Sequence, residues 1–288
     1  MNGAMTLADG RVVGVAEFGR PDGEAVLWCH GGPGSRLEPM WLGDQARDAG
    51  LRLVGIDRPG YGHSPPRPGR TIVDGARDVL AVADHLGIDR FATVGVSTGG
   101  VYALATAAVA PERVTAVVPC CAMTDMRFEP ARSTMSAPHT LSVWAAPDRE
   151  SAIAAATDSH GLHGEKLTDG GVRAILSDND RLLFADPAWM RDAMASFREM
   201  FRWGLEGYAD DRIADGGGWV GFDVADIRCP VVVLHGADDQ MCRPVHAEHT
   251  VAIVPGARLD LRPGDGHFSI EAHVVPTLRE LLLSAQPG

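Results

Sequence analysis

The sequence contains no apolar run of about 18 residues, few cysteines and comparatively little positive charge. A run of that length is needed to span a bilayer as a helix, so we expect no membrane-spanning segment. Residues 1–10 contain neither a basic stretch nor an apolar one, which argues against a secretory signal peptide. The sequence therefore favours a protein of the cytoplasm that does not act within a membrane.

Positive charge is in deficit, because 26 Lys and Arg residues face 38 Asp and Glu residues, for a formal net charge of −12. An acidic surface repels the phosphates of nucleic acids and the headgroups of anionic lipids. We therefore expect a small-molecule partner and no binding to nucleic acid or to membranes. The oligomeric state stays open, with a homodimer as one option.

The cysteines are few and odd in number, and they show no Cys-x-x-Cys or zinc-ligand spacing. They are Cys29, Cys120, Cys121, Cys229 and Cys242. This pattern favours buried free thiols in a reducing compartment. His160 and His163 lack a third ligand at a useful spacing, so we interpret them as solvated loop histidines and expect no metal site.

Short apolar runs with strand character alternate with helical patterns along much of the 288 residues. The predicted strands are residues 25–29, 51–56, 91–96, 114–118, 230–234 and 258–262. Runs that are apolar at nearly every position are typical of strands covered by helices on both faces. The alternation predicts an α/β fold with a mostly parallel, doubly wound sheet.

Three stretches have helical spacing of apolar residues. Residues 72–86 follow a capping box of Thr71 and Asp74, and Gly87 ends them. Residues 98–110 form a small-residue helix. In residues 268–284 the proline at 276 predicts a kink or a break between two helices.

The alternating pattern is interrupted over residues 125–221, where no convincing strand is visible. Residues 187–208 predict one amphipathic helix, while 158–171 and 214–218 are typical of loops or hinges. We interpret 125–221 as a helical cap, or lid, inserted into a core formed by residues 1–124 and 222–288.

The strongest chemical signal is Gly95-Val-Ser-Thr-Gly99, which follows a predicted strand and opens a predicted helix. A serine at such a turn exposes its hydroxyl, and the flanking glycines permit close backbone approach. The start of the helix also presents N–H groups to a developing oxyanion. Ser97 is therefore the predicted nucleophile.

Several motifs in this order resemble the α/β-hydrolase superfamily, with the serine as nucleophile and a helical cap. They are His30-Gly-Gly-Pro-Gly-Ser35, Asp57-Arg-Pro-Gly-Tyr-Gly-His-Ser64, the Ser97 motif, His235-Gly-Ala-Asp-Asp239 and Gly264-Asp-Gly-His267. The His30 motif is similar to that of proline iminopeptidases and of many bacterial esterase-like hydrolases. The resemblance covers nearly the whole chain, and it implies the fold more firmly than any substrate.

A serine hydroxyl needs a base to attack at neutral pH, and the base needs an orienting carboxylate. His267 follows the last predicted strand in the Gly-His-Phe context typical of the family's catalytic histidine. The competing His246, His249 and His273 lie on predicted helices and fit this role poorly.

Two adjacent carboxylates, Asp238 and Asp239, follow the predicted strand that ends at residue 234. The resemblance favours Asp239, three residues after Gly236, and leaves Asp238 as a solvated loop residue. Asp125, after the fourth predicted strand, is a more distant alternative.

The resemblance also implies an oxyanion hole formed by the amides of Thr98 and Gly32, with Gly31 as the neighbouring alternative. His30 is expected to hold this loop by hydrogen bonds. The turn at Asp57 and Arg58 is expected to stabilise the fold through a hydrogen bond or an ion pair.

Together these residues predict a serine hydrolase that cleaves a small or medium carboxylic ester through an acyl-enzyme, with no metal or organic cofactor. Ser97 stands where the resemblance places the aspartate nucleophile of dehalogenases and epoxide hydrolases, which disfavours those activities. A carbon–carbon bond hydrolase and a cofactor-free perhydrolase remain open, as does a ligand receptor with slow hydrolysis.

A proline aminopeptidase also remains open. Such an enzyme needs acidic cap residues that hold the free amine of its substrate. The cap carboxylates considered for this role are Glu199, Glu206, Asp210 and Asp211.

Overall fold

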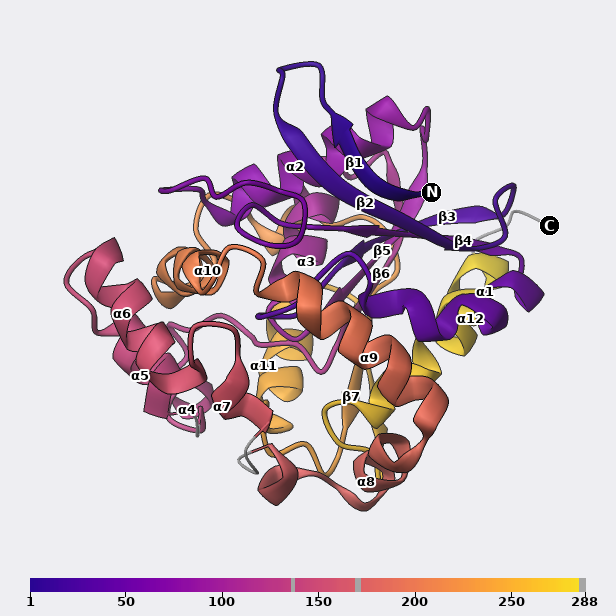
Figure 1. The fold of residues 1–288 in the computed structure, drawn as a ribbon. Coiled ribbons are helices and arrows are strands. Elements are labelled where there is room, and N and C mark those ends of the chain that lie inside the picture. Colours follow the sequence, from indigo (N-terminus) through magenta and orange to yellow (C-terminus); the bar gives the residue numbers. More distant parts are fainter. Residues whose placement is uncertain (136–137, 169–171, 285–288) are drawn as a thin grey trace.

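The computed structural model describes residues 1–135, 138–168 and 172–284 (Figure 1). Their strands form one eight-stranded sheet in the order β1-β2-β4-β3-β5-β6-β7-β8. These strands are β1 (Asn2–Thr6), β2 (Val12–Gly19), β3 (Glu24–Cys29), β4 (Leu51–Ile56), β5 (Phe91–Val96), β6 (Val114–Cys120), β7 (Val232–Gly236) and β8 (Arg258–Arg262). Strand β2 runs antiparallel to both β1 and β4, whereas the pairs from β4 to β8 are parallel.

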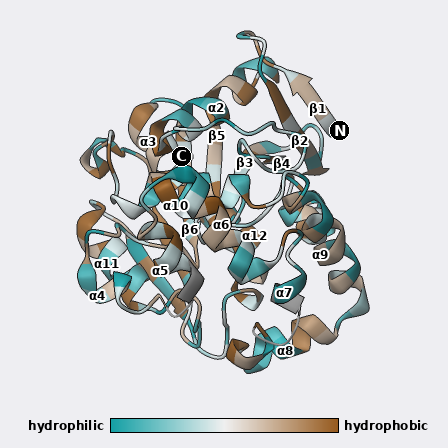
Figure 2. Cartoon of the chain, turned by 60° about the vertical axis from the view of Figure 1, so that its left-hand side comes forward, coloured by the Kyte–Doolittle hydropathy of each residue, from teal (hydrophilic) through white to brown (hydrophobic). Residues whose placement is uncertain are grey.

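Helices cover both faces of the sheet, and each face has its own apolar core. Along β3, Leu27 and Cys29 face a core that includes α2 (Ile72–His85), α3 (Gly99–Val109) and α11 (Val245–Ile253). The alternate residues of β3 face a core that includes α1 (Gly43–Asp48) and α12 (Val274–Ser284). Apolar residues lie on the central strands, and hydrophilic residues are spread over the surrounding helices (Figure 2). The predicted doubly wound α/β fold is confirmed.

All six predicted strands are present; three have the predicted bounds, and three differ by one or two residues at their ends. The antiparallel pair β1 and β2 was not predicted. Strand β2 contains glycine, alanine and glutamate within Val12–Gly19, so it lacks the continuous apolar run of the central strands. It lies near one edge of the sheet, where fewer apolar contacts are required.

The capping box at Thr71 and Asp74 is confirmed at the start of α2. The C-terminal break lies elsewhere than predicted, because a short 3-10 turn, η4 (Ser269–His273), precedes α12 and Pro276 is the third residue of that helix. A proline is tolerated there because the first amides of a helix have no partner within the helix.

Residues between β6 and β7 contain helices and no strand within the described part of the chain (Figure 1). The α-helices are α4 (Glu129–Arg132), α5 (Pro138–Trp144), α6 (Arg149–His160), α7 (Glu165–Thr168), α8 (Asp178–Ala185), α9 (Pro187–Met200) and α10 (Glu206–Gly216). The 3-10 turns η2 (Arg173–Ile175) and, just beyond residue 221, η3 (Val224–Asp226) complete the connection to β7. The inserted segment is therefore helical, whereas its limits as a cap domain at 125 and 221 stay a prediction.

Two details of this segment differ from the prediction. The single helix predicted over 187–208 is divided into α9 and α10 by a turn that contains Gly204 with φ +61°. The predicted loops are partly helical, because α6 and α7 extend into 158–168 and α10 includes 214–216; residues 169–171 lie outside the described part. Among the described helices, none has the length and apolar character needed to cross a bilayer.

Candidate active site

Ser97 lies between β5 and α3 with φ +51°, a left-handed conformation that is rare for any residue except glycine. The two motif glycines are required by close packing: a Cβ on Gly95 would lie 2.2 Å from the Gly99 carbonyl oxygen, and one on Gly99 would lie 2.0 Å from the Cys29 carbonyl oxygen. Ser97 is half-buried, so its side chain is accessible at the carboxyl edge of the sheet. The turn has the strained strand-to-helix form that the motif predicts.

Asp239 and His267 are hydrogen-bonded to each other, with 2.7 Å between Oδ2 and Nδ1. The second carboxylate oxygen of Asp239 accepts the amides of Met241 and Cys242 at 2.8 and 2.9 Å. Both side chains are buried. Since the carboxylate accepts from Nδ1–H, the Nε2 atom of the imidazole is left for another partner.

The charges of Asp239 and His267 shift each other's pKa. Burial favours a neutral imidazole, but the Asp239 carboxylate outweighs it and raises the pKa of His267 well above its ordinary value. Burial likewise raises the pKa of Asp239, and the attraction of His267 overcomes it, so that this pKa lies below its usual range.

The described residues show no hydrogen bond between Ser97 and His267. Instead, the thiol of Cys121 lies beside the pair, because its sulfur, a carboxylate oxygen of Asp239 and a ring nitrogen of His267 all lie within 4.8 Å of one another. Burial raises the pKa of the thiols of Cys121 and Cys242 well above the ordinary value, so they stay protonated. The structure thus brings the predicted acid and base together, with a thiol beside the base.

Cys121, Asp239 and His267 each offer one atom that could bind a metal ion, and these atoms lie within 4.8 Å of one another. A metal would require a thiolate and would compete with the short Asp239–His267 hydrogen bond. Because burial keeps Cys121 protonated, the chemistry of these donors does not favour a metal.

The inserted segment helps to hold the loop that carries His267. Asp180, the third residue of α8, accepts the amides of Phe268 and Ser269 at 3.1 and 2.8 Å. The same carboxyl group closes a capping box with Ser177. A helix of the insertion and a loop of the core are therefore joined directly behind the imidazole.

The two residues predicted to form the oxyanion hole lie in contact. A Cβ on Gly32 would lie 2.7 Å from Oγ1 of Thr98, so the Gly32 backbone packs closely against the Thr98 side chain. No hydrogen bond of the described residues uses the amide of Gly32 or of Thr98. The alternative, Gly31, is occupied, because its N–H donates to Oε1 of Glu38 at 2.9 Å. The geometry therefore favours Gly32 over Gly31.

His30 holds the glycine loop, as predicted. The Arg58 amide donates to its Nε2 at 3.1 Å, so Nδ1 carries the proton and donates to the Gly31 carbonyl at 2.7 Å. The Arg58 side chain also donates to the carbonyls of His30 and Gly31. Asp57 stabilises the neighbouring turn by accepting the amides of Arg36 and His63 and by pairing with the Arg36 guanidinium.

The rejected alternatives lie elsewhere. Asp238 is exposed and accepts the amide of Gly264 at 3.0 Å. Asp125 pairs with Arg127. His246 and His249 lie on α11, as predicted, and contact Thr124 rather than Ser97.

His273 ends the turn η4 and contacts Asp265. The interpretation of His160 as a solvated loop residue is wrong: it is buried at the end of α6 and its ring lies 4.6 Å from that of Tyr208. His163 is exposed, as predicted.

All four cap carboxylates considered for binding an amine already pair with arginines. Glu199 pairs with Arg36, and Glu206 and Asp210 both pair with Arg149. Asp211 is fully buried and pairs with two arginines of the core loops, Arg58 and Arg70. It also accepts from the hydroxyls of two buried tyrosines, Tyr61 and Tyr102.

Three residues beside the site were not identified from the sequence. They are Glu38, Cys121 and Arg212, which contact the Gly31 amide, the His267 ring and the Thr98 hydroxyl respectively. A lone Glu, Cys or Arg carries no motif, so only the folded structure reveals these contacts.

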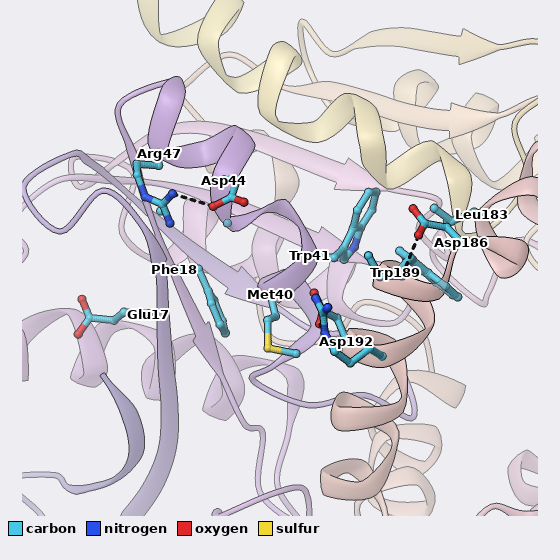
Figure 3. Close-up of a pocket in the computed structure, with 14 residues that line it drawn as sticks. Glu17, Phe18, Met40, Trp41, Asp44, Arg47, Leu183, Asp186, Trp189 and Asp192 are labelled. Carbon is cyan, nitrogen blue, oxygen red and sulfur yellow. Dashed lines mark hydrogen bonds and ion pairs between the residues drawn. The ribbon is translucent and has the colours of Figure 1, made fainter.

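A surface pocket of about 450 Å³ lies away from these residues, between β2 and the helices α1, α8 and α9 (Figure 3). Trp41 and Trp189 lie near one end of it, and the Asp44–Arg47 ion pair lies at the other. None of Ser97, Asp239 and His267 lines this pocket.

The sequence profile of the alpha/beta hydrolase fold matches residues 24–274. This chain belongs to the α/β-hydrolase family. The proline iminopeptidase of Neisseria gonorrhoeae is 38% identical over 105 residues, which are 35% of this chain and 34% of that protein. That match spans about a third of the relative's length. The proline iminopeptidase of Lacticaseibacillus rhamnosus is 27% identical over 268 residues, 88% of this chain and 87% of that protein.

Solved structures of the family resemble this α/β hydrolase over nearly its full length. An esterase from Exiguobacterium antarcticum has a TM-score of 0.70 at 20% identity and covers 99% of this chain and 98% of its own. The enol-lactonase from Burkholderia xenovorans has a TM-score of 0.70 at 19% identity and covers 98% of each chain. At these identities the likeness establishes the fold.

Proposed function

We propose that this α/β hydrolase cleaves small or medium carboxylic esters through an acyl-enzyme on Ser97. The observation that carries the proposal is the left-handed turn of Ser97 at the edge of the sheet where the buried Asp239–His267 pair also lies. The free thiols of the five cysteines fit our expectation of a reducing, cytoplasmic location.

In the first half of the reaction, Oγ of Ser97 attacks the acyl carbon while Nε2 of His267 accepts the hydroxyl proton. This step requires the Ser97 hydroxyl to come within hydrogen-bonding distance of Nε2 of His267. Asp239 holds the proton on Nδ1 and stabilises the imidazolium. The amides of Gly32 and Thr98 donate to the oxyanion, a contribution of about 3–4 kcal/mol for a single donor.

In the second half, the tetrahedral intermediate collapses, the bond to the leaving oxygen breaks, and His267 returns the proton to the departing alcohol. Water then gives a proton to His267 and attacks the acyl carbon. The bond to Ser97 breaks, Ser97 recovers its proton, and the carboxylic acid is released. Each step uses residues of this chain and water only.

The names of the curated relatives favour a second candidate, cleavage of an N-terminal proline residue. Such a substrate carries a cationic amine that requires an available carboxylate. Asp211, the most buried of the four considered, is shared by Arg58 and Arg70, so releasing it would leave two buried cations without a partner. The geometry therefore favours the ester.

The test is steady-state hydrolysis of p-nitrophenyl esters from acetate to decanoate, with proline p-nitroanilide in parallel, for the wild type and Ser97→Ala. We expect repeated turnover of esters and a loss of about 10⁴-fold or more in the variant. The chain-length optimum measures the size of the acyl site.

Two outcomes would overturn the ester assignment. Faster cleavage of the proline anilide than of any ester would move it to an aminopeptidase. A single turnover followed by arrest would indicate a receptor with slow hydrolysis, because an enzyme must cycle.

A further inference from the structure

Arg212, on helix α10 of the inserted segment, reaches the predicted oxyanion hole. Its side chain is 2% exposed. The Nη2 atom donates to Oγ1 of Thr98 at 2.6 Å, and Nη1 contacts the sulfur of Met123 at 3.3 Å. Thr98 follows Ser97 directly and lies against Gly32. A guanidinium therefore contacts the side chain of Thr98, the residue whose amide we assign to the oxyanion hole.

The hydrogen-bonding capacity of this guanidinium is not filled. Within the described residues, its buried Nε atom has no hydrogen-bond partner. Its ion-pair partner, Asp215, approaches to 2.5 Å between Oδ2 and Nη2, yet that oxygen also lacks a hydrogen bond of acceptable geometry. Buried polar groups without partners are uncommon in folded proteins, which indicates that a ligand completes this group.

The charges around Arg212 do not balance either. Three buried guanidiniums, of Arg58, Arg70 and Arg212, face two carboxylates, those of Asp211 and Asp215. Burial, only partly opposed by Arg212, raises the pKa of Asp215 to about 6. Even with Asp215 ionised, these ion pairs contain one more positive than negative charge. The carboxyl of Glu38 also acts on Arg58, but burial raises the pKa of Glu38 to about 7, so its compensation is incomplete. A buried cation is costly without an anionic partner.

We propose that Arg212 binds a carboxylate carried by the substrate, so that the preferred substrates are esters with a second, free carboxylate group. This inference rests on the proposed ester hydrolysis at Ser97 and names the class of ester. Planar, bidentate recognition of a carboxylate is the interaction for which a guanidinium is best suited. The same charge disfavours a substrate with a cationic amine near Ser97.

The carboxylate can belong to the acyl part or to the alcohol part, and matched pairs of esters distinguish these sources. For the acyl part, the mono-p-nitrophenyl ester of adipate is compared with p-nitrophenyl hexanoate, which has an acyl chain of the same length. For the alcohol part, 4-acetoxybenzoate is compared with its methyl ester. A hydrogen bond to a charged group predicts at least about a tenfold preference in kcat/KM for the anionic member of one pair.

The variants are Arg212→Met, Arg212→Lys and a control, Arg149→Met. Arg149 is another arginine of the inserted segment and pairs with Asp210 and Glu206. We expect Arg212→Met to remove the preference for the anionic ester, chiefly by raising KM. Arg212→Lys is expected to keep part of the preference, and Arg149→Met all of it.

The proposal is overturned if the wild type shows no preference in either pair, or if the preference survives in Arg212→Met. An equal loss for both members of a pair would also overturn it, because it would assign Arg212 a structural role alone. If ester hydrolysis at Ser97 is itself wrong, the result differs from these outcomes, because Ser97→Ala then does not reduce the cleavage of either member of a pair.

A binding measurement does not depend on turnover or on the folding of Arg212→Met. We expect calorimetry on Ser97→Ala to show adipate binding at least about tenfold more tightly than hexanoate, and Arg212→Lys in the same background to weaken adipate. Equal binding of the two acids would contradict the proposal.

Discussion

The predicted catalytic residues and the arginine cluster lie next to each other but are built in different ways. Ser97, Asp239 and His267 each follow a strand of one sheet, and the parallel strands deliver them to the same edge. Arg58 and Arg70 follow strand β4, whereas Asp211 and Arg212 lie on a helix about 140 residues later. The first group is assembled by one sheet, and the second exists only where the insertion meets the core.

This difference teaches which contacts should tolerate change. A residue on a rigid strand end can lose its chemistry while the fold survives. A charge in the cluster is buried and shared among several partners, so its removal leaves the remaining charges buried without a partner. The first group should therefore respond in activity, and the second in stability, with Arg212 also affecting the choice of substrate.

The largest effect is expected from Asp239→Asn. It should lower kcat by about 10⁴-fold, because an amide cannot hold the proton on Nδ1 of His267 or stabilise the imidazolium. The matched control is Asp238→Asn, since Asp238 is exposed and its carboxylate accepts the Gly264 amide. The measurement is kcat on the best p-nitrophenyl ester, with thermal unfolding as a check. A larger loss in Asp238→Asn would reverse the assignment of the acid.

The next effect concerns stability. Asp211→Asn should lower the free energy of unfolding by about 3–5 kcal/mol, because it leaves Arg58 and Arg70 buried without a counter-charge. Glu206 on the same helix is the control: it is part-exposed and pairs with the part-exposed Arg149, which keeps Asp210, so Glu206→Gln should cost about 1 kcal/mol or less. Urea unfolding measures both. Equal losses of unfolding free energy in the two variants would show that the buried cluster stabilises the fold no more than a part-exposed ion pair does.

A third prediction tests another contact of the insertion with the core, through His246. The Thr124 amide donates to its Nδ1 at 3.3 Å, and the Thr134 hydroxyl lies 3.3 Å from Nε2. Burial lowers the pKa of His246 from 6.5 to about 4. Between these values the folded state binds fewer protons than the unfolded state, so stability is lost as the pH falls from 6.5 toward 4.

We therefore expect the wild type to lose about 2 kcal/mol more than His246→Gln between pH 7 and 4.5 in urea unfolding. His163→Gln, at an exposed position of the insertion, serves as the control and should follow the wild type. An unchanged slope in His246→Gln would mean that other groups cause the acid sensitivity.

The smallest effect is a shift in the pH profile of ester hydrolysis. The base must be neutral, and Asp239 raises the pKa of His267 well above 6.5, so kcat/KM should rise with pH through a value above 6.5. The measurement is kcat/KM between pH 5 and 9 on a neutral ester. If kcat/KM reached half of its maximum below pH 6.5, the raised pKa of His267 would be contradicted.

Much of the site could be predicted because its chemistry follows recognisable strand ends. Gly95 and Gly99 mark the turn of Ser97 because close backbone contacts exclude side chains there. The division of residues 187–208 into two helices was missed, since Gly204 breaks the helix within an otherwise continuous apolar pattern. The burial of His160 was missed because its neighbour, Tyr208, lies on a different helix.

The sequence by itself determined six of the eight strands, the turn at Ser97 and the candidates for its acid and base. These features depend on local backbone geometry and on apolar patterns, which short segments encode. Only the tertiary structure decided that Gly31 is occupied by Glu38, that Cys121 lies against His267 and that Arg212 reaches Thr98. The first contact depends on how the glycine loop folds back, the second on neighbouring strands of the sheet and the third on how the insertion packs on the core, and no local pattern records any of these.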